Sequence, residues 1–177
     1  MDVDASTHVV TPAPEDVKIG ASTPTVRNLF PDVSAQATSM TWKSVLTGVS
    51  DMDENVAVEA MKGVCHEIMN AKDNVALHAS MVGDIDALVS SLVKRIEHIF
   101  ITAIANPSKG TRGCRYVLNA LMQIHQERVF ATAVTEPTQR AFVKQLILIL
   151  LDERVMTLAD GESLIKAANM LMIAMME

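Results

Sequence analysis

Residues 84–105 read DIDALVSSLVKRIEHIFITAIA, and this stretch decides the fold class. Its apolar side chains recur at steps of three and four residues, at Ile85, Leu88, Val89, Leu92, Ile96, Ile99 and Phe100. Because an α-helix turns once in about 3.6 residues, this spacing places them on one helical face. Asn106 and Pro107 follow, and proline disfavours helical backbone in the residue before it, so the helix is predicted to end there.

The same periodicity continues on both sides of this helix, with short polar stretches between the apolar runs. It predicts further helices over 41–47, 53–71, 111–128, 135–152 and from 160 onward. Asp51 or Asp53 is expected to cap the helix over 53–71, because a carboxylate accepts hydrogen bonds from the unpaired amides of a first turn. The inward face of that helix is predicted to consist of Val56, Met61, Val64, Cys65 and Ile68.

The predicted helices fall into pairs that begin near Thr41, Asp84 and Pro137. These starts are roughly 43 and 53 residues apart, close to the ~40 to 47 residue unit of HEAT and armadillo repeats. In such repeats each helix pair buries its apolar face against the next pair. The sequence therefore predicts an all-α fold of HEAT- or armadillo-like antiparallel helix pairs, about three repeats long, with a compact helical bundle as the alternative.

Composition supports packed helices in a reducing compartment. Only 3% of the residues are aromatic, twelve are methionine, and 15 basic side chains against 21 acidic ones give a net charge of −6. Cys65 and Cys114 are too few for a disulfide framework. The first residues hold acids and prolines where a signal peptide needs a basic and then an apolar run. The apolar run over 146–151 is far shorter than the ~20 residues that cross a bilayer. We therefore expect a soluble intracellular protein without a membrane partner.

The N-terminal segment differs from the rest of the chain. Four of the six prolines lie in its first 31 residues, at Pro12, Pro14, Pro24 and Pro31. Its small polar residues show little apolar periodicity, which is typical of a disordered segment. We predict a disordered linker or arm over residues 1–40 and a helical-repeat domain over residues 41–177.

No motif indicates catalysis, a cofactor or a metal. Cys65 and Cys114 occupy apolar positions of predicted helices, and no pair of possible zinc ligands has the spacing of a zinc site. The glycines form no dinucleotide or phosphate loop. Residues 110–113, GTRG, resemble the G-x-x-G loop of KH domains, which leaves an RNA-binding module as one alternative. The strands of a KH fold are missing, however, and a net charge of −6 opposes a nucleic-acid partner.

A small basic cluster is the main candidate for binding. Lys109, Arg112 and Arg115 lie together, with no acidic residue between Pro107 and Gln126. The cluster is either a solvated loop or the edge of a helical repeat that meets an acidic protein surface.

Trp42 and the methionines have two interpretations each. We interpret Trp42 as the core anchor of the first helix, with an exposed contact residue as the alternative. Met172 and Met175 fall on the predicted core stripe of the last helix, where methionine fills gaps. Met170 or Met176 is expected to face a neighbour.

Four stretches resemble the large TOG-domain microtubule polymerases, in particular the plant-type microtubule-organisation proteins. They are VAVEAMKGVCHEI over 56–68, CRYVLNALMQ over 114–123, LLDERV over 150–155 and DGESLIKAANMLM over 160–172. They occur in the order found in that family. The resemblance implies a TOG-like α-solenoid from the C-terminal part of such a protein.

The resemblance also implies a function and a site. Members of the family are not enzymes. They bind αβ-tubulin, promote microtubule growth at plus ends, and organise spindle and cortical arrays in the cytoplasm. The loops between the two helices of each repeat form their tubulin-binding edge, which carries over to Lys109, Arg112, Arg115 and Arg154. Family chains are much longer, so a fragment, truncated at its C-terminal end with an exposed apolar face on the last helix, is expected.

One departure from the family keeps a second function open. Tubulin-binding members carry a tryptophan and basic residues in the first loop, whereas this loop reads SDMDE over 50–54. Trp42 lies too early to be that tryptophan. The alternative is a protein-interaction adaptor that docks a helical targeting protein and makes no direct tubulin contact.

Overall fold

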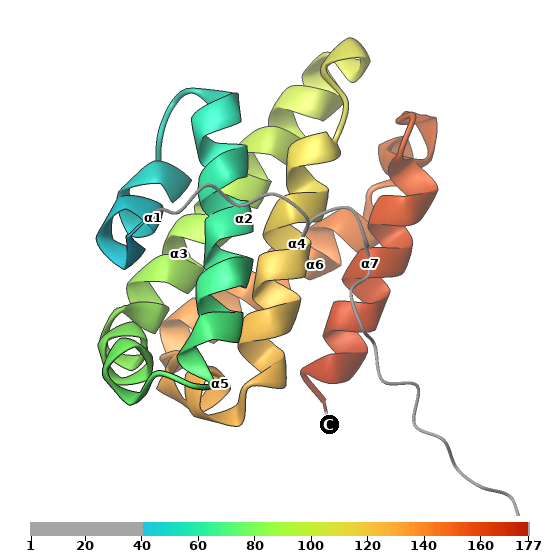
Figure 1. Cartoon of the computed structure of the whole chain (residues 1–177). Coiled ribbons are helices and arrows are strands. Elements are labelled where there is room, and N and C mark those ends of the chain that lie inside the picture. The colour runs from blue at the N-terminus through green and yellow to red at the C-terminus, as the bar shows by residue number, and fades with distance from the viewer. Residues whose placement is uncertain (1–40, 177) are drawn as a thin grey trace, which may run out of the picture.

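The computed structural model describes residues 41–176, and every regular element in that range is helical (Figure 1). The α-helices are α1 (Trp42–Val49), α2 (Glu54–Ala71), α3 (Val75–Ala105), α4 (Arg112–Gln126), α5 (Arg128–Ala133), α6 (Glu136–Leu151) and α7 (Gly161–Ala174). Two short 3₁₀ segments, η2 (Pro107–Lys109) and η3 (Glu153–Thr157), lie in the connections. The all-α prediction is confirmed, and the predicted disordered arm over 1–40 lies outside the described residues.

The helices pack as antiparallel pairs, α1 with α2, α3 with α4 and α6 with α7. Between pairs, α2 packs on α4 and α4 on α7, while α1 packs on α3 and α3 on α6. The result is two layers of helices, as in an α-solenoid, with α5 packed on α3 and α4 at the lower end of Figure 1. This arrangement confirms the predicted helical-repeat architecture.

Trp42 anchors the first helix in the core, as the sequence suggested. Its side chain is buried, and its indole Nε1 donates a hydrogen bond of 3.0 Å to Asp84 Oδ2 on α3. Asp53 is the cap of α2, because its Oδ1 accepts hydrogen bonds from the backbone N–H groups of Asn55 and Val56. Both predictions are confirmed.

One core prediction for α2 is wrong. Val56 is 41% exposed, and Ala57 and Ala60 take the inward positions beside Met61. The small alanine side chains let α1 approach closely, since a Cβ placed on Gly48 would lie 2.8 Å from Ala60 Cβ. The other predicted inward residues of α2 are buried.

Two helix predictions also differ from the structure. Helix α3 begins at Val75 rather than near Asp84, with the Asn74 side chain accepting a 3.0 Å hydrogen bond from the Leu77 N–H. Val75 is 86% exposed, but Leu77, Met81 and Val82 pack against the core, so the apolar stripe of α3 extends into the turns before Asp84. The predicted helix over 111–128 is interrupted at Glu127, and a separate short helix, α5, follows with buried Phe130 as its anchor.

A candidate protein-interaction edge

The three loops that join the helices of each pair lie at the same end of the molecule, the upper end in Figure 1. They cover residues 50–53, 106–111 and 152–160. Because the pairs stack side by side in the same direction, their loops form one edge. The loop edge, as we call these three loops and the first turn of α4, contains Lys109, Arg112, Arg115 and Arg154.

Two glycines shape the middle loop of this edge. Gly110 ends η2 with a φ of 69°, in the left-handed region that side chains with a Cβ rarely adopt. A Cβ on Gly113 would lie 2.7 Å from Ile99 Cδ1, so this glycine permits close packing of α4 on α3. The G-x-x-G spacing is thus accounted for by a turn and a helix contact, and residues 41–176 contain no strand with which to build a KH fold.

Lys109 and Arg112 point away from the protein core. Both are exposed, and the Lys109 side chain makes no hydrogen bond or ion pair with the described residues. Arg112 donates a hydrogen bond of 3.4 Å to the Tyr116 hydroxyl, and this hydrogen bond raises the pKa of the guanidinium above its usual value. The Tyr116 ring also lies 5.7 Å from Lys62 Nζ, so two cations from different helices share one aromatic ring.

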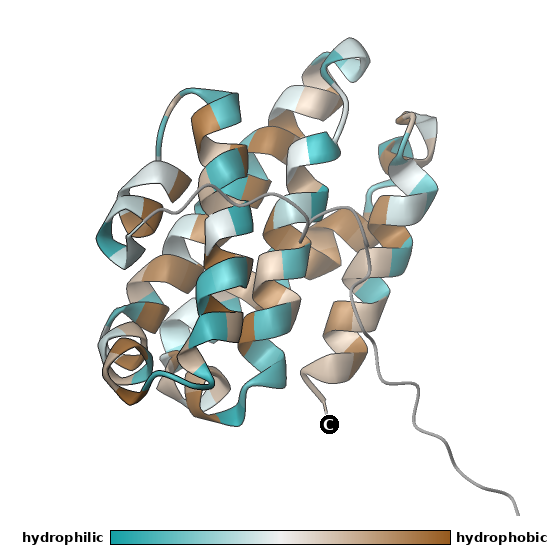
Figure 2. Cartoon of the chain, in the orientation of Figure 1, coloured by the Kyte–Doolittle hydropathy of each residue, from teal (hydrophilic) through white to brown (hydrophobic). Residues whose placement is uncertain are grey.

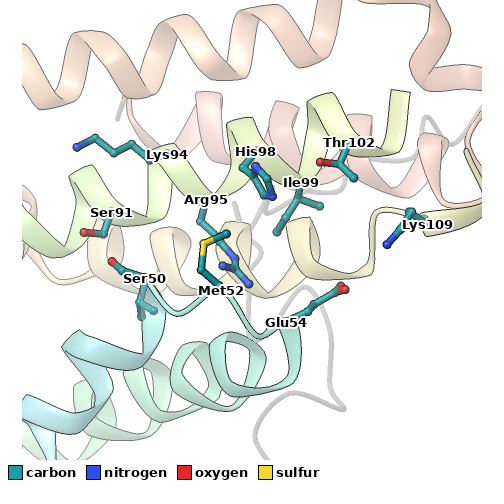
Figure 3. Close-up of a pocket in the computed structure, with 12 residues that line it drawn as sticks. Ser50, Met52, Glu54, Ser91, Lys94, Arg95, His98, Ile99, Thr102 and Lys109 are labelled. Carbon is teal, nitrogen blue, oxygen red and sulfur yellow. The ribbon is translucent and has the colours of Figure 1, made fainter. Parts of the chain in front are cut away.

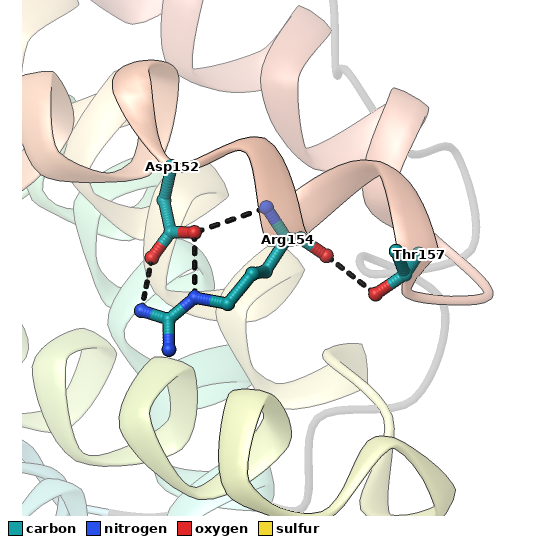
Figure 4. A network of polar contacts seen from close by, with 3 residues as sticks. All are labelled: Asp152, Arg154 and Thr157. Carbon is teal, nitrogen blue, oxygen red and sulfur yellow. Dashed lines mark hydrogen bonds and ion pairs between the residues drawn. The ribbon is translucent and has the colours of Figure 1, made fainter.

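Arg115 and Arg154 have different surroundings. Arg115 is half-buried one turn into α4. Arg154 is exposed but ion-paired: its Nε and Nη2 donate to the two carboxylate oxygens of Asp152 at 2.9 and 2.7 Å (Figure 4). This pair lowers the pKa of Asp152, and the Thr157 hydroxyl donates to the Arg154 carbonyl at 2.7 Å. The positive charge of Arg154 is therefore largely compensated within its own loop.

A groove beside the middle loop contains basic residues that the sequence analysis missed. The basic groove, as we name it, lies between the loop over 50–53, helix α3 and η2, and has a volume of about 580 Å³ (Figure 3). Lys94, Arg95 and His98 line it from α3, and Lys109 lines it from η2. The spacing of the three α3 residues is a signal for a basic helix face, but their position beside Lys109 depends on tertiary packing.

A second groove runs between α6 and α7. It has a volume of about 730 Å³ and apolar walls that include Ile147, Leu148 and Met175. Figure 2 shows that the C-terminal half of α7 is almost entirely hydrophobic, whereas α2 and α4 carry many hydrophilic residues. Met176 is 75% exposed at this groove, while Met170 packs partly against the core.

The two cysteines are core residues. Both thiols are buried, and burial raises the pKa of Cys65 and of Cys114 to about 12. A thiol with such a pKa stays protonated and unreactive at neutral pH. Over residues 41–176, His, Cys, Asp and Glu side chains form no group of three or more that could hold a metal ion. Nor does this range contain a helix that is both long and apolar enough to span a bilayer.

The stacked helix pairs and their common loop edge define an α-helical repeat module. No protein-family model and no solved structure matches the chain. It is 38% identical over 138 residues to Protein MOR1 of Arabidopsis thaliana and 36% identical over 137 residues to Protein MOR1 of Oryza sativa subsp. japonica. Each alignment covers 77% of this chain and 7% of the relative. The chain belongs to the MOR1 family, as a relative of one segment of these proteins, and the resemblance found in its sequence is confirmed.

Proposed function

We propose that residues 41–177 form a non-enzymatic module of a microtubule-associated protein, which binds tubulin through the loop edge. In this proposal the module acts in the cytoplasm, on microtubules and the spindle, and contributes to plus-end growth and to spindle and cortical organisation. The observation that carries the proposal is the common edge of three loops with outward cations, in a chain related to MOR1 proteins.

The surroundings of the four cations of the loop edge indicate which of them contribute most to tubulin binding. Lys109 and Arg112 are exposed cations, and tubulin, as the family resemblance implies, presents an acidic surface. Oppositely charged surfaces accelerate association and fix the register of two partners. Arg115 is half-buried and Arg154 is paired with Asp152, so we expect both to contribute less than Lys109 and Arg112.

The test is a charge reversal of the basic cluster, with Lys109, Arg112 and Arg115 all changed to Glu. Binding to purified tubulin is measured by co-sedimentation and anisotropy across a salt series. We expect salt-dependent binding by the natural chain and a loss of about tenfold or more in the variant. Glu in the first turn of α4 is favourable for the helix dipole, so folding should persist, which circular dichroism checks.

A matched control reverses three exposed charges elsewhere: Lys43, Arg128 and Lys166 changed to Glu. This variant has the same net charge as the first. Equal losses in the two variants, or tubulin binding that the first variant leaves unchanged, would contradict the assignment of the loop edge.

The adaptor alternative rests on the groove between α6 and α7. Its apolar walls and the exposed Ile147, Leu148 and Met176 fit the apolar face of a partner helix. In this case the folded chain does not bind tubulin, and a Met176→Asp variant loses binding to an amphipathic helical partner. Tubulin binding that survives Met176→Asp but not the charge reversal favours the loop edge.

A further inference from the structure

The basic groove has the shape of a channel rather than a pocket for one small ion. The lining residues of α3 run from Ser91 to Thr102 along one stripe of the helix. At about 1.5 Å of rise per residue, the stripe is roughly 16 Å long. Such a length matches about five residues of an extended peptide at ~3.3 Å each.

The charges of the groove are predominantly positive. Of the twelve lining residues, Lys94, Arg95 and Lys109 are cations, and Glu54 is acidic. Figure 3 shows Lys94 toward one end and Lys109 toward the other, with Arg95 and His98 between them. The cations are therefore arranged in a row, which suits a chain of separate negative charges better than a single compact anion.

Arg95 is held in place by the neighbouring repeat. Its Nη1 donates a hydrogen bond of 2.5 Å to the Asp51 carbonyl in the loop between α1 and α2. Its Nε is buried and has no hydrogen-bond partner among the described residues. The bond to the Asp51 carbonyl fixes the orientation of the guanidinium at the groove, and a planar guanidinium is well suited to carboxylates.

The other walls of the groove favour a peptide over a nucleic acid. Met52 is 89% exposed and Ile99 is partly buried, so the channel offers aliphatic and thioether contacts beside its charges. No Phe, Tyr or Trp lines the groove, although single-stranded nucleic acids depend on aromatic rings for base stacking.

We propose that the basic groove binds an extended, carboxylate-rich peptide segment of a partner protein, about five residues long. Lys94 and Lys109 contact the acidic side chains at the two ends, and Arg95 contacts a central carboxylate. This site lies along α3 and does not depend on tubulin binding by the rest of the loop edge.

The probe is a fluorescein-labelled peptide of about ten residues with alternating Glu and Gly, and the same peptide with Gln serves as its neutral control. Anisotropy titrations with the full chain should show binding of the Glu peptide, weakening as salt is added, and no binding of the Gln peptide. Changing Lys94 and Lys109 together to Glu should weaken binding about tenfold or more. Both side chains are exposed and make no hydrogen bond or ion pair with the described residues, so the variant should fold.

The matched control changes Lys43 and Lys166 to Glu, which alters the net charge equally at exposed sites outside the groove. It should bind the Glu peptide within about twofold of the natural chain. The proposal is overturned if the folded chain does not bind the Glu peptide, or if the control variant loses as much binding as the groove variant. Tighter binding of a single-stranded RNA oligonucleotide than of the peptide would also overturn it. Because tubulin is absent from this assay, its outcome is independent of the proposed function.

Discussion

At the scale of single residues, Gly161 shows how strongly backbone packing can restrict a side chain. It begins α7 directly beside η3, and a Cβ placed on it would overlap the Val155 carbonyl oxygen. That oxygen belongs to the backbone, so a rotamer change cannot relieve the clash. Gly83, by contrast, lies on α3 with open space around its Cα.

We predict that Gly161→Ala destabilises the protein by about 2 kcal/mol, a typical cost of overpacking. Gly83→Ala should raise the free energy of unfolding by about 0.5 to 1 kcal/mol, because alanine favours an exposed helix interior over glycine. Urea denaturation followed by circular dichroism measures both. A Gly161→Ala variant as stable as the natural chain would show that η3 can move away without cost.

Trp42 and the basic cluster mark how far single residues could be predicted. The burial of Trp42 followed from its place in an apolar pattern, but its partner Asp84 is 42 positions away and no local spacing indicates it. Lys109 and Arg112 were found because they are neighbours in the sequence. Lys94 and Arg95 were missed because only the packing of α3 against the first loop and η2 brings them to Lys109.

At the scale of elements, helix ends depend on caps from near and far. Asp53 and Asn74 cap their own helices, and residues of this type before an apolar run are recognisable in a sequence. The N-terminus of α6 is different. There the Thr135 N–H donates a hydrogen bond of 2.8 Å to Asp86 Oδ1, a carboxylate on α3. This bond lowers the pKa of Asp86 below 3.8.

We predict that Asp86→Ala destabilises the fold by up to about 1 kcal/mol at neutral pH, because α6 loses a cap. The folded-state pKa of Asp86 is lowered, so its contribution is present at a pH above 3.8 and is lost as the pH falls through the folded-state pKa. The difference between the variant and the natural chain should therefore shrink in acid. Thermal unfolding at several pH values measures it.

Two controls accompany this experiment. Asp86→Asn keeps an acceptor without a titrating proton, so it should retain part of the stability at neutral pH. Glu97→Ala removes an exposed carboxylate from the same helix and should change little. If Glu97→Ala reproduces the effect of Asp86→Ala, the loss reflects the charge of α3 rather than a cap on α6.

The first turns of α3 and helix α5 were not predicted from the sequence, for the same physical reason. The turns of α3 before Asp84 are short and begin with exposed Val75, with Leu77, Met81 and Val82 against the core, and α5 has only six residues, fewer than two helical turns. Periodicity needs a window longer than that to be visible. Both segments are held in helical conformation by the core packing of a buried side chain, Met81 in α3 and Phe130 in α5.

At the scale of the whole molecule, the two ends of the helix stack differ. At the α6–α7 end, Ile147, Leu148 and Met176 line one groove and are 40%, 48% and 75% exposed, and Ile173 nearby on α7 is 54% exposed. Apolar side chains gathered on one face favour association with another surface. The isolated chain should therefore self-associate weakly through this face as its concentration rises.

We predict that changing Ile173 and Met176 together to Lys reduces this self-association without lowering the melting temperature by more than a few degrees, since both side chains are already largely exposed. Sedimentation velocity over a concentration series measures it. Val75→Lys, at an exposed apolar position on α3, is the control. Association that responds to Val75→Lys and not to the α7 changes would assign it to another surface.

Trp42, the one tryptophan of the chain, also makes the opposite end of the stack observable. Its indole emits from within the contact between α1 and α3, whereas the helical circular dichroism signal sums over all the repeats. Stacked repeats contact only their neighbours and can open from a terminus inward. Tryptophan fluorescence is thus an intrinsic optical marker for detachment of α1, and a red shift that precedes the loss of helicity during heating would record the order in which the stack comes apart.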